Sequence, residues 1–68
     1  MYSVARQTIY GVCQDTIKSS YEEAIEVCKE WSKEYPNCDI VIYEVDLDKG
    51  YTQVYAMRNK KVVFTMNK

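Results

Sequence analysis

The clearest hydrophobic pattern along the chain predicts an amphipathic helix between Ser20 and Pro36. Its apolar positions share one arc at about 100° per residue, and glutamate and lysine fill the opposite arc. Ser20 and Glu23 form a capping box that satisfies free backbone N–H groups of the first turn. Pro36 ends the helix because the residue before a proline is pushed out of the helical region. We expect a buried stripe centred on Trp31. The stripe consists of Tyr21, Ala24, Ile25, Val27, Cys28, Trp31, Ser32 and Tyr35.

Three strands that form a meander are expected after the helix. The segment Asp48–Gly50 suits a three-residue hairpin loop, because glycine takes a positive φ at the last position without strain. The dipeptide Asn59–Lys60 suits a two-residue loop. Together these loops predict two consecutive antiparallel hairpins.

The loops also predict the register, with Leu47 opposite Tyr51 and Arg58 opposite Lys61. Side chains then alternate between two faces of the sheet. One face, which we expect the helix to cover, collects Val41, Tyr43, Val45, Leu47, Tyr51, Tyr55, Met57, Val62, Phe64 and Met66. The other face collects Ile40, Ile42, Glu44, Asp46, Thr52, Val54, Ala56, Val63 and Thr65.

The residues before the helix add at least one strand. Residues 2–10 are rich in β-forming residues and predict a strand, and Gly11 suggests a bulge or bend. Residues 12–17 either continue that strand or fold back as a second one, and the sequence leaves both alternatives open. The prediction is an α+β fold in a single domain, residues 1–68. It is a two-layer sandwich of order β-α-β-β-β, with one helix on a mostly antiparallel sheet.

Composition adds an argument for oligomerisation. A chain of 68 residues has one small core, and scaffolds of this size usually gain stability from disulfides, a metal or association. Cys13, Cys28 and Cys38 are odd in number and widely spaced, which indicates free thiols in a cytoplasmic protein. The sequence has no histidine and no Cys-x-x-Cys motif that would bind a metal ion. Ile40–Tyr43, an apolar run that no other in the sequence exceeds in length, is too short to span a membrane. A homo-oligomer is therefore expected.

Residues that carry chemistry are scarce. Gly11 and Gly50 are isolated, so no glycine-rich loop for a cofactor phosphate is expected. Glu44 and Asp46 share a strand face, where they solubilise the end of an apolar surface. We therefore predict no catalytic residue, no cofactor, no metal and no enzymatic activity.

The sheet face without a helix is the predicted site. It should bind a protein partner, because exposed apolar surface with a polar border is typical of interaction sites. The residues predicted to bind the partner are Ile42, Glu44, Val54, Ala56 and Val63.

Two alternatives follow from charge. The net charge is −1, but nine of the ten acidic residues lie in residues 21–48, while residues 49–68 are basic. Arg58, Lys60 and Lys61 suggest binding of an anionic small molecule such as a nucleotide, which an oligomer would sequester. Single-stranded nucleic acid is the other alternative, since tyrosines on an open sheet can stack bases. It is disfavoured because the strand tyrosines are assigned to the face beneath the helix.

Three segments resemble small accessory proteins of tailed bacteriophages. They are Ser20–Trp31, Asp39–Asp46 and Gly50–Tyr55, which match the capped helix and short antiparallel sheet of such proteins. The resemblance covers about two thirds of the chain and implies a host-takeover or anti-defence role exerted by binding. It brings no catalytic residue. The sequence thus predicts a non-enzymatic interaction protein that inhibits or modulates another macromolecule.

Overall fold

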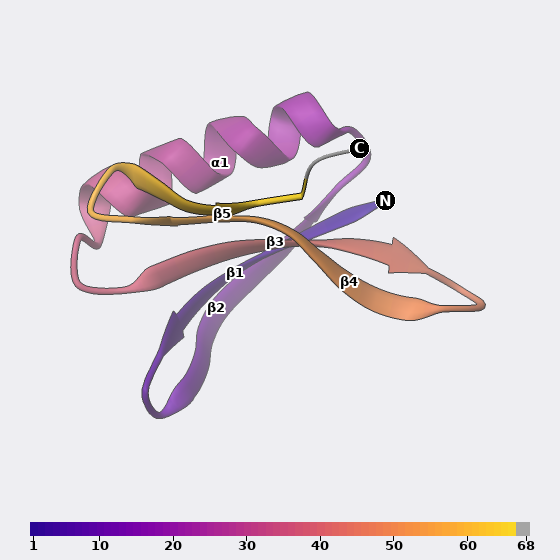
Figure 1. Cartoon of the computed structure of the whole chain (residues 1–68), viewed down its shortest axis with the longest axis horizontal. Helices are drawn as coiled ribbons and strands as arrows, with labels where there is room; N and C mark the ends of the chain where they lie inside the picture. Colours follow the sequence, from indigo (N-terminus) through magenta and orange to yellow (C-terminus); the bar gives the residue numbers. More distant parts are fainter. Residues whose placement is uncertain (67–68) are drawn as a thin grey trace.

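The computed structural model describes residues 1–66 as one helix packed on a five-stranded antiparallel sheet (Figure 1). The sheet has the order β2-β1-β3-β4-β5. The elements, in chain order, are β1 (Tyr2–Thr8), β2 (Gly11–Lys18), α1 (Tyr21–Glu34), β3 (Asp39–Asp46), β4 (Gly50–Arg58) and β5 (Lys61–Thr65).

The expected α+β class is confirmed, but the predicted order β-α-β-β-β is one strand short. Residues 12–17 fold back as part of β2, the second of the two alternatives, with Thr8 opposite Gly11. Gly11 takes φ +114°, a conformation that favours glycine. The turn itself, Ile9 and Tyr10, is almost fully exposed. A hairpin therefore precedes the helix.

The boundaries of α1 agree with the capping signals. The backbone N–H of Glu23 donates to Oγ of Ser20 at 3.2 Å, and Oγ of Ser20 donates to the Glu23 carboxylate at 3.1 Å. The helix ends at Glu34, two residues before Pro36. The centre of its buried stripe differs from the prediction, because Trp31 is only partly buried. The most buried helix residues are Ala24, Cys28 and Ser32.

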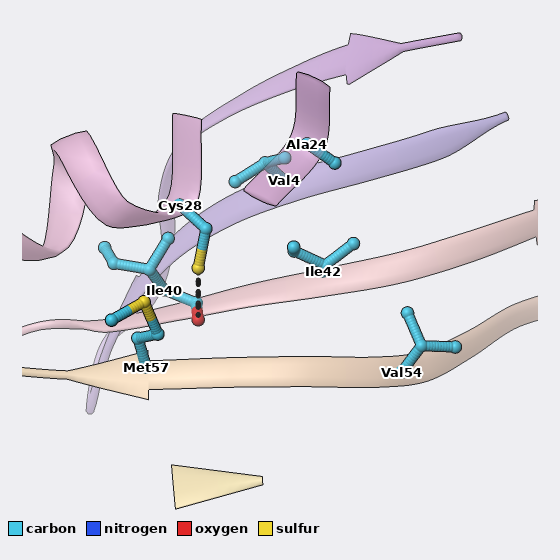
Figure 2. Packing of buried hydrophobic residues seen from close by; sticks show 7 residues of the cluster. All are labelled: Val4, Ala24, Cys28, Ile40, Ile42, Val54 and Met57. Carbon is cyan, nitrogen blue, oxygen red and sulfur yellow. Dashed lines mark hydrogen bonds between the residues drawn. The ribbon is translucent and has the colours of Figure 1, made fainter. Parts of the chain in front are cut away.

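The core lies between α1 and the middle strands (Figure 2). Cys28 faces β3, where its thiol donates to the backbone carbonyl of Ile40 at 3.6 Å. Ser32 accepts a hydrogen bond from the backbone N–H of Lys60 at 2.8 Å, which fastens the β4–β5 turn to the last turn of the helix (Figure 1). The cluster contains Val4, Ala24, Cys28, Ile40, Ile42, Val54 and Met57.

The register between β4 and β5 is the predicted one at the turn. Arg58 lies opposite Lys61, and Asn59 and Lys60 take φ values of 52° and 66°. Such positive values at both positions match the twist of a two-residue hairpin. Farther along, Ala56 lies opposite Phe64 and Val63 is left unpaired as a β-bulge.

The register between β3 and β4 differs from the prediction. Val45, rather than Leu47, lies opposite Tyr51, and a bulge follows in which Val54 has no partner between the pairs Tyr43–Gln53 and Ile42–Tyr55. Because of the bulge, Tyr55 and Met57 lie on the side of Ile42 and Ile40, so the predicted faces of β3 are exchanged with respect to the helix. Ile40 and Ile42 face the helix, and Val41, Tyr43 and Val45 share the face away from it.

Candidate functional site

One face of the sheet has no helix over it, because α1 is the only helix among residues 1–66 and packs on the other face. We call this surface the open face. Residues opposite one another in an antiparallel pair point to the same side, so the pairings define it. It contains Ser3, Ala5 and Gln7 of β1; Val12, Asp15 and Ile17 of β2; Asp39, Val41, Tyr43 and Val45 of β3; Tyr51, Gln53, Ala56 and Arg58 of β4; and Lys61 and Phe64 of β5.

Small side chains form the middle of the open face. Ser3, Ala5, Val41 and Ala56 are buried although no helix lies over them, because they are short and have longer neighbours. Larger apolar groups surround them and reach solvent. Ile17 is 50% exposed, Phe64 40% and Tyr51 65%. Apolar side chains from three strands therefore border a floor of small residues.

Two tyrosines on this face are ordered by contacts. The rings of Tyr43 and Tyr51 pack edge to face, with their centroids 6.1 Å apart and an interplanar angle of 71°. The amide Nε2 of Gln7 donates to the hydroxyl of Tyr43 at 2.7 Å. Aromatic groups fixed in this way lose little conformational freedom when they bind a partner.

Acidic and basic side chains balance on the open face. Its acids are Asp15 and Asp39, and its bases are Arg58 and Lys61. Nε of Arg58 lies 3.8 Å from Oδ1 of Asp39, and both side chains are half exposed. The glutamates of α1 belong to the helix on the other side of the sheet, so they do not charge the open face.

The residues predicted to bind the partner do not gather on one surface. Ile42 is fully buried and Val54 is 9% exposed, both beneath α1. Their predicted place on the uncovered face is wrong, because α1 packs on the side of β3 that carries Ile42, and Val54 at the bulge points to the same side. Glu44 lies on the same side as Ile42, where its carboxylate accepts from the Tyr2 hydroxyl at 3.4 Å. Burial and the neighbouring Glu44 carboxylate raise the pKa of Tyr2.

The remaining two residues predicted to bind the partner, Ala56 and Val63, lie elsewhere. Ala56 is part of the open face but buried, whereas Val63 is exposed at the β5 bulge. The sequence did not predict Ile17 as a site residue, because it left open whether residues 12–17 form a separate strand, and it placed Tyr51 and Phe64 under the helix.

The three basic residues of the anionic-ligand alternative do lie together, at the β4–β5 turn. Arg58, Lys60 and Lys61 are exposed. Arg58 is also the ion-pair partner of Asp39, so one of the three positive charges is partly neutralised.

The environment of Cys38 includes a cation that the local sequence did not reveal. Nη1 of Arg6 lies 3.9 Å from Sγ of Cys38, and the same guanidinium lies 4.0 Å from the centre of the Tyr35 ring. Arg6 is distant in the sequence and reaches Cys38 because β1 pairs with β3.

Within residues 1–66, no cluster of three or more histidine, cysteine, aspartate or glutamate side chains is arranged to hold a metal ion. The helix in this part of the chain is not long and apolar enough to cross a membrane. No protein-family model, no curated protein and no solved structure matches the chain.

Proposed function

We propose that the protein is a non-enzymatic interaction protein that binds a protein partner through the open face. The observation that carries the proposal is the exposure of Ile17, Tyr51 and Phe64 on a sheet face without a helix. Apolar and aromatic side chains that surround a centre from which water is excluded are typical of the cores of protein interfaces. The resemblance to phage accessory proteins suggests in addition that binding inhibits or modulates the partner, and that role stays a prediction.

A protein partner fits the charge of this face better than nucleic acid does. Tyr43 and Tyr51 lie on the open face, which removes one argument against the stacking of bases. Binding of a phosphate backbone, however, depends on excess positive charge. The two acids and two bases of the open face leave no such excess.

Two isoleucines of the same hairpin provide a matched test. Ile17 lies on the open face, whereas Ile9 lies at the exposed β1–β2 turn outside it. We expect Ile17→Lys to weaken partner binding at least about ten-fold, or about 1.4 kcal/mol, and Ile9→Lys to leave it unchanged. A partner is first captured on the immobilised protein and identified by mass spectrometry. The purified partner is then titrated calorimetrically against all three proteins.

Circular dichroism must show the same fold in both variants. Equal affinity of Ile17→Lys and wild type for the purified partner would contradict the proposal. Capture of RNA or single-stranded DNA with an affinity that falls steeply with salt would instead support the nucleic-acid alternative.

A further inference from the structure

Strand β5 differs from the other strands of the sheet in how little of it is covered. Every residue of Lys61–Thr65 is exposed. Helix α1 has Cα atoms within 8 Å of β1, β2, β3 and β4 but not of β5. Val62 is 51% exposed, Val63 59% and Phe64 40%. The strand thus presents apolar side chains to solvent on both faces of the sheet.

Within residues 1–66, one edge of β5 has no strand paired with it. The backbone N–H of Met66 donates to the carbonyl of Val54 at 3.0 Å, so it points toward β4. Because successive backbone groups of a strand point in opposite directions, the N–H of Thr65 points to the free edge. An uncovered edge with apolar side chains is a template for another strand.

We propose that β5 pairs antiparallel with β5 of a second copy of the chain, forming a continuous ten-stranded sheet about a twofold axis. The charges along β5 suit this pairing. Lys61 at one end is the only charged residue of the strand, and antiparallel pairing places it beside the other end of its partner. The two lysines are then separated by the length of the strand, and the apolar residues between them meet.

The opposite edge of the sheet does not suit self-association. Asp15 lies next to the centre of β2, so pairing of β2 with its own copy in the register centred on Asp15 would place two Asp15 carboxylates opposite each other. Like charges that face each other across strands are destabilising. Pairing of β5 with β2 of another copy would leave two edges free and extend into a fibre. The closed dimer therefore uses β5 twice.

The dimer is expected to dissociate readily. A stable specific interface buries about 800 Å² on each partner, and a five-residue strand offers less. A twofold axis perpendicular to the sheet would place both open faces on the same side of the dimer. A partner with two binding sites could then bind both open faces at once, which would raise its affinity.

Two valines with nearly equal exposure test the proposal. Val63 of β5 is 59% exposed and Val12 of β2, at the other edge, is 58% exposed. We expect sedimentation equilibrium between about 10 μM and 1 mM, a range that covers modest affinities, to show a wild-type dimer. Val63→Lys should raise the dissociation constant at least about ten-fold, and Val12→Lys should leave it unchanged.

A measurement on the wild type makes the test independent of how the variants fold. The exchange of the Thr65 amide proton, followed by NMR, should slow as protein concentration rises. A monomer at the highest concentration, dimerisation of Val63→Lys equal to wild type, or Thr65 exchange independent of concentration would overturn the inference. Ile17→Lys should still dimerise, because Ile17 lies on β2 at the opposite edge of the sheet. A failure of the proposed partner binding can therefore be distinguished from a failure of the proposed dimer.

Discussion

The three cysteines, all predicted to be free thiols, occupy different environments. Cys13 is exposed on β2, Cys38 is partly buried beside Arg6, and Cys28 is fully buried in the core. Burial raises the pKa of the Cys28 thiol to about 12. Because the thiolate is the nucleophile, Cys28 is both shielded and protonated near neutral pH.

Labelling with a maleimide at pH 7 should therefore distinguish Cys28 from Cys13. We expect Cys13 to react in the native protein and Cys28 to react only after denaturation, because reagent access to Cys28 requires unfolding. Peptide mass spectrometry at successive times measures both rates. Equal rates for the two residues in the native protein would show that Cys28 is not buried between α1 and the sheet.

At the scale of elements, the sequence predicted the helix and the β4–β5 turn because their signals are local. Ser20, Glu23 and Pro36 act within a few residues of themselves. The sequence left the β1–β2 hairpin open as one of two alternatives, because Ile9 and Tyr10 are β-forming residues in a turn and only Gly11 indicates the reversal. Such a turn cannot be distinguished from a bulge by local propensity alone.

The bulge at Val54 explains why the site was predicted less well than the fold. One extra residue in β4 moves every later side chain of that strand to the other face. The predicted register also began from Leu47 opposite Tyr51, whereas the hairpin pairs Val45 with Tyr51. An uncovered face could therefore be predicted from the single helix, but not the residues that line it.

The β3–β4 turn contains a carboxylate that should make stability depend on pH. Asp46 accepts hydrogen bonds from the backbone N–H groups of Asp48 and Lys49 at 2.7 and 3.0 Å, and these lower its pKa. A carboxyl with a lower pKa in the folded state stabilises the fold above its unfolded pKa, about 3.9. That contribution is lost as the pH falls through the folded value.

Asp46→Asn tests this effect, because the amide oxygen still accepts hydrogen bonds but does not titrate. We expect the urea midpoint of the variant to fall less than that of wild type between about pH 5 and pH 2. Far-UV circular dichroism at several pH values measures both midpoints. The same loss in both proteins would assign the acid sensitivity to other carboxyl groups.

At the scale of the whole molecule, the helix and the strands of residues 1–66 give a core on only one side of the sheet. The fully buried side chains are few, and Ile40, Ile42 and Val4 are the largest. A core of this size rarely contributes more than about 3 to 5 kcal/mol of net stability. The open face and β5 lie outside this core, and association through either surface would add stability.

This narrow margin predicts that a single core truncation unfolds much of the protein. Ile42→Ala removes buried methyl groups beneath α1 and should cost about 2 to 5 kcal/mol, comparable with the total. Ile9→Ala, at an exposed turn residue, should change stability by no more than about 0.5 kcal/mol. Urea unfolding followed by circular dichroism measures both. If Ile42→Ala were as stable as Ile9→Ala, Ile42 could not lie beneath the helix, and the assignment of the two sheet faces would have to be reversed.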